Sequence, residues 1–358
     1  MLGQLCGFQG GLLGWYSAGH RDLPWRTAPN SPSGSTPDPY HVLVSEVMLQ
    51  QTQVDTVVSY FLRFIERLPT ISDLAAADER EVLRLWQGLG YYSRVRNLQA
   101  SAKIIVNRYS GRLPSSVEEL LGLPGIGRYT AGAIVSLAFD QRAPILDGNV
   151  ARVLCRIDAI EDDPRASLTR RKLWERAEQI LPAERVGEFN SALMELGATV
   201  CTPRDPKCEA CPVARHCGAL RRGIQERVPM PARARPRAME RRWVLCIQNR
   251  KRYLIEQRPA NGRWASMWQF ATVPAGQKAP SVGMVRRELG MSVRTSRLVG
   301  SFHHDLTHRR YQFDVYRCTA QSTPREVAPR RWVSLEQLSD YPLPLPHQKI
   351  AALLRKGG

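Results

Sequence analysis

Two carboxylic acids stand in contrasting surroundings that could give them opposite protonation states. Glu46 lies in an apolar stretch beside Val47 and Met48, where burial would raise its pKa and keep it a proton donor. Asp147 directly precedes a predicted helix, whose free N–H groups and dipole would keep it ionised. Such a pair can protonate a leaving group and stabilise a cationic transition state, as in glycoside hydrolysis. The alternatives are an exposed helical glutamate and an aspartate that only caps a turn.

A second chemical signal is a cluster of cysteines. Four of the eight cysteines are separated by six, two and five residues: Cys201, Cys208, Cys211 and Cys217. In a chain without a secretion signal, a clustered quartet indicates a metal centre and not disulfides. Four thiolates on a short loop can hold a zinc ion or a cubane iron–sulfur cluster. The spacing alone leaves both open and slightly favours zinc.

A glycine-rich turn, Leu123-Pro124-Gly125-Ile126-Gly127, separates two predicted helices. Gly125 and Gly127 allow the backbone to approach a ligand closely, and the second helix begins with free N–H groups. Such a helix end binds anions, of which a DNA phosphate is the obvious one. The alternative is an ordinary helical hairpin with a turn proline.

The composition is compatible with nucleic-acid binding. The 358 residues include 51 Lys and Arg against 33 Asp and Glu, a net charge of +18. Basic side chains bind DNA because each neutralised phosphate releases counterions, although a generally basic soluble protein is the alternative. The sequence has no apolar run of about 18 residues and no recognisable signal peptide. We therefore predict a cytoplasmic bacterial protein that works at the nucleoid.

Helical periodicity dominates residues 1–217. Apolar side chains recur at helical spacing over residues 42–68 and predict one helix there. Glu46, Gln50 and Gln53 would lie on one side of it. Further helices are predicted at about 72–77, 79–89, 95–109, 116–121, 129–139, 149–157, 168–180 and 189–201.

The residue pattern changes after the cysteine cluster. The next stretch is basic and proline-rich, as expected of an interdomain linker. Beyond it, alternating patterns predict a hairpin near 243–257 and a strand near 311–316, with helices near 280–289 and 348–355. The predicted parts are a helical domain at 1–217, a linker at 218–240 and a small α+β domain at 241–358.

The order of several motifs resembles the MutY family of adenine DNA glycosylases, in the endonuclease III branch of helix-hairpin-helix enzymes. The motifs are the four-cysteine spacing and the runs LPWR at 23–26, SEVMLQQTQ at 45–53, GLGYY at 88–92, LPGIG at 123–127 and LDGNV at 146–150. The resemblance covers nearly the whole chain. It implies an α+β protein overall, in which an all-α helix-hairpin-helix glycosylase domain with an iron–sulfur loop precedes a small α+β Nudix-like domain.

The resemblance also implies an activity and a cofactor. Members of the family remove adenine mispaired with 8-oxoguanine or guanine in double-stranded DNA and leave an abasic site. The four cysteines would hold a [4Fe–4S] cluster that positions DNA and takes no part in hydrolysis. Arg204 and Lys207 lie between these cysteines and could contact phosphate, with plain solvation as the alternative.

The resemblance assigns roles at the reacting bond. Glu46 would be the acid and Asp147 the stabiliser of the sugar cation, while Tyr129 hydrogen-bonds near them and Asn149 orients the aspartate or a water. Packing and helix capping are the alternatives for the last two. In the bifunctional endonuclease III branch, a lysine at the Tyr129 position attacks the sugar. Here no lysine occurs between Lys103 and Lys172, so a monofunctional enzyme is predicted.

Other matching positions concern recognition of DNA, since the target adenine must leave the base stack before it reacts. Gln51 and Tyr91 would probe and intercalate beside 8-oxoguanine, and such a wedge can kink the duplex. Core packing is the alternative for Tyr91. Further DNA contacts are implied for Thr52, Leu89, Gly125 and Gly127, and Arg26 with Trp25 would border the adenine pocket.

The C-terminal domain resembles a Nudix domain that has lost its own chemistry. A working Nudix hydrolase needs several carboxylates on one helix to hold Mg²⁺, but Glu288 is the single acidic residue between Gln277 and Met291. A family Phe-Ser-His loop that contacts 8-oxoguanine aligns with Leu306-Thr307-His308. Thr307 and His308 would therefore bind the lesion, with a leucine in place of the aromatic residue.

Two competing functions stay open. One is a bifunctional glycosylase/lyase for oxidised pyrimidines, against which the missing lysine and the additional domain argue. The other is a catalytically silent mismatch-binding protein, against which the presence of both carboxylic acids argues. A monomer is expected, and no protein partner is indicated.

Overall fold

The computed structural model describes residues 2–26, 36–230, 237–306, 309–321 and 329–356. The chain divides into two compact units, residues 1–76 with 97–233 and residues 77–96 with 234–358. Thr307 and His308 lie outside the described residues, as do residues 27–35. None of the helices in the described ranges is both long and apolar enough to span a membrane.

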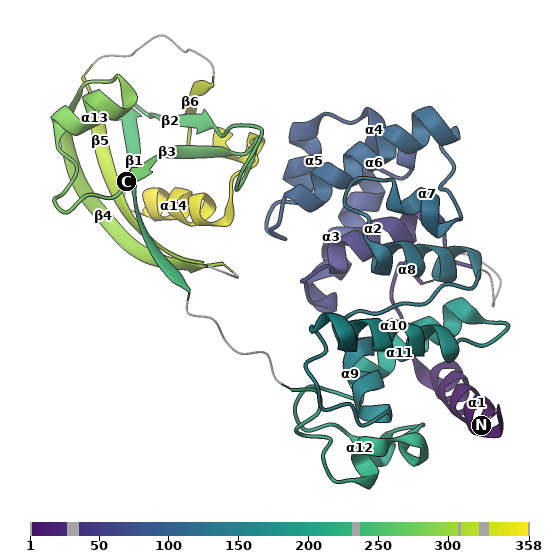
Figure 1. The fold of residues 1–358 in the computed structure, drawn as a ribbon. Coiled ribbons are helices and arrows are strands. Elements are labelled where there is room, and N and C mark those ends of the chain that lie inside the picture. Colours follow the sequence, from purple (N-terminus) through teal and green to yellow (C-terminus); the bar gives the residue numbers. More distant parts are fainter. Residues whose placement is uncertain (1, 27–35, 231–236, 307–308, 322–328, 357–358) are drawn as a thin grey trace. The chain divides into compact units, whose positions relative to one another are not determined.

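The described part of the first unit is helical (Figure 1). One of its core clusters is formed by apolar side chains of the first helix and of the helices that follow the glycine-rich turn, including Leu12, Val150, Leu173 and Phe189. The helices are α1 (Leu2–Gly19), α2 (Pro39–Leu49), α3 (Val54–Arg67), α4 (Ile71–Ala76), most of α6 (Ser93–Tyr109), α7 (Val117–Leu121), α8 (Arg128–Phe139), α9 (Gly148–Ile157), α10 (Ser167–Gln179), α11 (Val186–Thr199), α12 (Gly218–Arg221) and the 3₁₀ turns η1 (Cys208–Ala210) and η2 (Ala214–His216).

The prediction of a single helix over residues 42–68 is wrong. The structure has α2 ending at Leu49 and α3 beginning at Val54, with Gln51 in the left-handed region at φ 59°. The Thr52 N–H bonds back to the Leu49 carbonyl at 3.2 Å. Apolar spacing persists across the break because both helices bury an apolar face, so periodicity alone does not reveal it. The break places the polar residues 50–53 in a turn.

Close backbone contacts fix α11 against its neighbours. A Cβ at Gly187 would lie 2.4 Å from the Ser136 carbonyl oxygen on α8, and one at Gly197 would lie 2.7 Å from the Asn149 Cβ on α9. Only glycine permits such approaches without displacement of the backbone. The first contact sets α11 against α8, and the second sets it beside the beginning of α9, where Asp147 lies.

Residues 218–230, which the composition assigns to the linker, pack as part of the first unit. They form α12 and bury Ile224 and Val228 in the helical core. The Arg156 guanidinium donates to the Val228 carbonyl at 2.8 Å. The predicted domain boundaries at 217 and 240 remain a prediction.

The second unit contains a mixed sheet between two helices (Figure 1). Residues 77–96, which include α5 (Glu79–Leu85), are grouped with this unit by their contacts. The strand order is β4-β5-β1-β3-β2-β6; β1 pairs with β5 in parallel, and the other neighbours are antiparallel. The elements are β1 (Ala238–Asn249), β2 (Arg252–Gln257), β3 (Trp268–Pro274), α13 (Val282–Leu289), β4 (Val293–Asp305), β5 (Arg309–Ala320), β6 (Arg330–Ser334), η3 (Gln337–Asp340) and α14 (Leu345–Lys356).

The side chains of β1 point alternately to the two faces of the sheet, and this explains why one helix packs on each face. Val244 packs in the cluster that contains Ile350 of α14, and Leu245 packs in the cluster that contains Val285 of α13. Neighbouring strand residues point to opposite faces, so each helix covers one face. The predicted hairpin is confirmed by the β1–β2 pairing, whereas β3, β4 and β6 were missed. In β4, the sequence Val293–Asp305 is largely polar and carries no clear apolar alternation.

Candidate active site

One pocket of the first unit gathers most of the predicted chemistry. Its lining comes from the turn after α1, from α2, from the break at 50–53, and from α8, α9 and α11. It contains the predicted residues Arg26, Glu46, Gln51, Thr52, Tyr129, Asp147 and Asn149, together with Trp25. Side chains that are distant in the sequence therefore meet at one cavity.

Glu46 lies inside this pocket on α2, a helix begun by Asp38, whose carboxylate accepts from the Tyr40 N–H at 2.7 Å. Only 4% of Glu46 is exposed. Burial raises its pKa to about 7, and nearby Asp147 adds to the rise, while a hydrogen bond with Tyr129 and the charge of Arg26 oppose it. The predicted direction is confirmed. Glu46 is therefore substantially protonated near neutral pH.

Asp147 is the N-cap of α9, as predicted, and its carboxylate accepts from the Val150 N–H at 2.7 Å. Burial nevertheless raises its pKa above the usual 3.8, and it outweighs the lowering by the backbone N–H groups of Val150 and Asn149 and by Arg152. The helix end lowers the pKa of Asp147 as predicted, but burial, which the sequence did not indicate, has the larger effect. The side chain is more deeply buried than a surface cap, so desolvation dominates.

Tyr129 and Asn149 have partners that the sequence did not indicate. The Tyr129 hydroxyl donates to the Met194 sulfur at 3.3 Å, and burial raises the pKa of Tyr129 well above its ordinary value. The Asn149 side-chain oxygen accepts from Arg152 at 2.8 Å. Both residues line the pocket beside Glu46 and Asp147.

A buried carboxylate that sequence reasoning missed organises the two arginines of the pocket. Glu195 on α11 is 2% exposed. It accepts from Arg21 at 2.7 and 3.0 Å and from Arg26 at 2.7 Å. These ion pairs lower the pKa of Glu195 to about 2, against the effect of burial. The sequence around Glu195 does not predict its ion pairs, because both arginine partners lie about 170 residues earlier in the chain.

The glycine-rich turn has the predicted form. Gly125 has φ 76°, and a Cβ there would lie 2.8 Å from Asn97. Gly127 is the N-cap residue of α8, with no side chain to occupy the free N–H groups. The turn can therefore present backbone donors to an anion.

Leu89 and Tyr91 belong to residues 77–96, which group with the second unit. Tyr91 has φ 48° and is 46% exposed, with the Arg94 guanidinium 5.5 Å from its ring centre. Leu89 is buried at 8% exposure. Tyr91 thus offers an exposed ring, and Leu89 is a packing residue in this structure.

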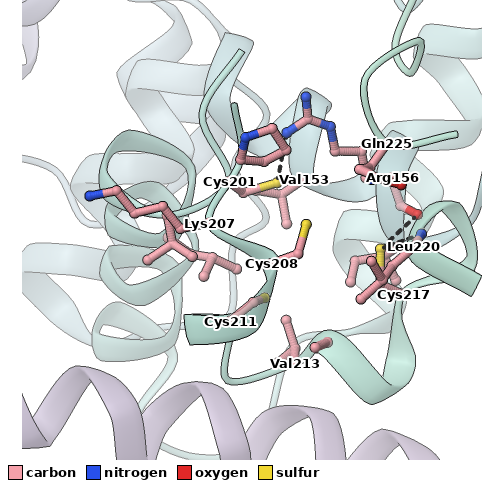
Figure 2. A pocket seen from close by; sticks show the side chains of 15 residues that line it. Val153, Arg156, Cys201, Lys207, Cys208, Cys211, Val213, Cys217, Leu220 and Gln225 are labelled. Atoms are coloured by element: carbon pink, nitrogen blue, oxygen red, sulfur yellow. Dashed lines mark hydrogen bonds between the residues drawn. The ribbon is translucent and has the colours of Figure 1, made fainter. Parts of the chain in front are cut away.

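The four clustered cysteines line a second pocket, and Figure 2 shows the sulfurs of Cys201, Cys208 and Cys217 turned toward one space. All four are free thiols. The Arg156 guanidinium donates to the Cys201 sulfur at 3.3 Å. Arg204 and Lys207 are exposed on the same loop. In the described part of the chain, no group of three or more His, Cys, Asp or Glu side chains is placed to hold a single metal ion.

Comparison with known proteins defines the class first. The HhH-GPD family, described as “HhH-GPD superfamily base excision DNA repair protein”, matches residues 44–179. A NUDIX domain matches residues 242–353. The solved structure of a thermostable thymine-DNA glycosylase has a TM-score of 0.53 at 28% identity and covers 61% of this chain and 97% of its own. The predicted fold class is confirmed.

Whole-chain relatives narrow the class to one family. The adenine DNA glycosylase of Mus musculus is 38% identical over 92% of this chain and 74% of its own length. That of Buchnera aphidicola subsp. Schizaphis graminum is 31% identical over 96% and 97%. The chain belongs to the adenine DNA glycosylase (MutY) family. It is a DNA N-glycosylase, a hydrolase of base excision repair.

Proposed function

We propose that this enzyme binds double-stranded DNA and excises adenine paired with 8-oxoguanine or guanine. The observation that supports it best is a buried Glu46, with a pKa of about 7, in the same pocket as Asp147. The leaving adenine must be protonated, and the sugar then carries positive charge. A protonated Glu46 supplies the proton, and Asp147 faces the developing cation. Asn149, at the start of α9, orients Asp147 or the attacking water.

The same pocket favours hydrolysis without a covalent sugar intermediate. A lyase would need an amine nucleophile beside the sugar. The described lining contains two arginines, Arg21 and Arg26, and no lysine. Arginine stays protonated and does not act as a nucleophile. Water is therefore the proposed nucleophile, and the product is an intact strand with an abasic site.

The cysteine pocket fits a [4Fe–4S] cluster. Its other walls include Val153, Leu196 and Val213, and such apolar walls shield a cluster from water. A single zinc ion would draw the four sulfurs to about 3.8 Å from one another, given Zn–S bonds of about 2.3 Å. The four cysteines line one pocket, and four thiolates can also ligate the larger cubane cluster that we propose here. When bound, the cluster would hold this loop in shape, and exposed Arg204 and Lys207 would contact phosphate.

Metal analysis tests this assignment. Anaerobically purified protein should contain about four iron atoms per chain and no stoichiometric zinc. Cys208→Ser should lower the iron content and the yield of folded protein, because binding of the metal is coupled to folding of its loop. Cys6→Ser changes an exposed thiol outside the pocket and should leave both unchanged. One zinc per chain without iron would contradict the assignment.

The C-terminal domain supports lesion recognition and not hydrolysis. Its helix α13 carries Glu288 alone among acidic residues, and Glu288 pairs with Arg287 at 3.1 Å. This leaves no carboxylate cluster on α13 for Mg²⁺. Contact of Thr307 and His308 with 8-oxoguanine, and intercalation by Gln51 and Tyr91, are part of the proposal.

A strand-cleavage assay separates the competing functions. Duplexes with A·8-oxoguanine and A·G pairs are incubated with enzyme and then analysed with and without hot alkali. Cleavage only after alkali is expected. Cleavage without alkali would indicate a lyase, and binding without cleavage under either condition would indicate a silent mismatch-binding protein.

A further inference from the structure

The hydroxyl group of Tyr129 stands between two acceptors. It donates to the Met194 sulfur on α11 at 3.3 Å. It also lies near the carboxyl group of Glu46 on α2, where a hydrogen bond between the two groups affects the pKa of both. All three side chains line the active-site pocket. The Oε2 atom of Glu46 is buried and has no hydrogen-bond partner in the described structure, so the orientation of the nearby Tyr129 hydroxyl decides whether this carboxyl group gains one.

A tyrosine hydroxyl has one hydrogen to donate and an oxygen that can accept. The pKa of Tyr129 lies well above its ordinary value, so this hydrogen stays in place at neutral pH. If it points toward Glu46, it stabilises the carboxylate and lowers the pKa of Glu46. If it points toward Met194, the phenol oxygen is left to accept from a protonated Glu46. The two arrangements therefore favour opposite protonation states.

We propose that Met194 is a positioning residue that directs the Tyr129 hydroxyl hydrogen away from Glu46, so that the Tyr129 oxygen accepts a hydrogen bond from the protonated Glu46 carboxyl. This inference rests on the proposed role of Glu46 as the acid. A thioether suits the task because it accepts a hydrogen bond weakly and does not donate one. It can turn the hydroxyl without competing for the proton of Glu46.

The other charged groups at Glu46 do not substitute for this contact. Asp147 at the start of α9 raises the pKa of Glu46, and Arg26 lowers it. Arg26 is held by Glu195, which follows Met194 on α11, through a contact of 2.7 Å. Asp147 and Arg26 affect the pKa of Glu46 through their charges. The Tyr129 hydroxyl would affect it through a hydrogen bond with the carboxyl group. Removal of the sulfur should therefore change the titration of Glu46 while Asp147 and Arg26 stay in place.

Met194→Leu tests the inference, because this exchange nearly conserves side-chain volume and removes the acceptor. Single-turnover excision is measured against pH on A·8-oxoguanine duplex with enzyme in excess. The basic limb of the wild-type profile reports loss of the Glu46 proton. In Met194→Leu this limb should move down by about half to one pH unit, because the form with protonated Glu46 loses the hydrogen bond from Tyr129 to the sulfur, whereas the ionised form keeps its hydrogen bond from Tyr129.

The titration of Glu46 is also followed directly by its ¹³Cδ NMR signal, assigned by its loss in Glu46→Gln. Tyr129→Phe removes the hydroxyl, so adding Met194→Leu to it should not move the Glu46 titration further. Met48→Leu makes the same exchange at a buried position two residues from Glu46 and should leave the profile unchanged. If Met194→Leu does not fold, Met194→Ile gives the same test.

An unchanged or raised Glu46 titration in Met194→Leu would overturn the inference. So would an equal shift in the Tyr129→Phe background. The NMR titration does not depend on catalysis, so failure of the inference is distinguishable from failure of the proposed function. If Glu46→Gln retains wild-type excision, Glu46 is not the acid, whatever its titration shows.

Discussion

The two carboxyl groups of the pocket illustrate how burial acts at the scale of single residues. Burial raises the pKa of both, but Asp147 also accepts backbone N–H groups of α9, whereas Oε2 of Glu46 has no such donor. Glu46 is therefore the group that retains a proton near pH 7. Backbone hydrogen bonds lower the pKa of Asp147, the proposed cation stabiliser, and Glu46, the proposed acid, accepts none from the backbone.

Glu46→Gln and Asp147→Asn should each lower single-turnover excision at least about 100-fold, in line with the contribution of general acid–base groups. Binding to mismatched duplex, measured by fluorescence anisotropy, should be nearly unchanged. Excision by the wild type should fall as the pH rises through about 7, where Glu46 loses its proton. Glu66→Gln, at an exposed position of α3, is the control and should behave as wild type. Normal rates in either active-site variant would disprove its role.

Glu195 should also stabilise the fold through its two arginines. Glu195→Gln should lower the free energy of unfolding by about 2–3 kcal/mol at pH 7, since removal of one partner leaves buried charge unpaired and Arg21 is partly screened by solvent. The folded-state pKa of Glu195 is about 2, below its ordinary 4.5. The stabilisation is therefore complete above pH 4.5 and is lost as the pH falls toward 2. Urea unfolding of both proteins from pH 7 to 2.5 measures this difference, and a pH-independent difference would contradict the assignment.

At the scale of elements, the site depends on how closely α11 approaches α8 and α9. Glycines at two crossings allow backbones to touch. Helix α11 carries Met194 into the pocket and places Glu195 against Arg26, which lines it. The break between α2 and α3 has a similar effect, since it turns Gln51 and Thr52 toward the cavity. The glycines of α11 and the break between α2 and α3 therefore determine which side chains line the pocket.

Gly197→Ala should displace the start of α9, because the added Cβ would lie 2.7 Å from the Asn149 Cβ. Excision should fall about tenfold or more, since small misplacements of reacting groups are costly. The melting temperature should fall as well. Gly14→Ala on α1 is the matched control, because a Cβ there meets nothing within 4 Å, and alanine should stabilise that helix slightly. Equal behaviour of the two variants would show that the contact does not position α9.

At the scale of the whole molecule, the chain combines a glycosylase unit with a Nudix-type sheet domain whose expected metal helix lacks a carboxylate cluster. Ile224 and Val228 are part of the first unit's core. A truncation that tests the separate role of the C-terminal domain must therefore end beyond them, after Met230.

Truncation after Met230 should preserve adenine excision and narrow the preference for A·8-oxoguanine over A·G. Each hydrogen bond to the oxidised base would contribute about 1–3 kcal/mol to discrimination. Single-turnover rates on both substrates measure the ratio, and iron content with a thermal melt verifies that the helical unit is intact. Thr307→Ala combined with His308→Ala in the full chain should narrow the ratio in the same direction. An unchanged ratio in both proteins would contradict lesion recognition by this domain.

The sequence alone determined features that depend on neighbouring residues or on ordered motifs. Apolar periodicity located most helices, and the motif order predicted the family. The position of Asp147 before a helix was also a local property. The tertiary structure decided the rest: the break after Leu49, the raised pKa of Asp147, and the contacts of Met194 and Glu195. These depend on burial and on partners brought together from distant segments, and local sequence patterns do not encode either quantity.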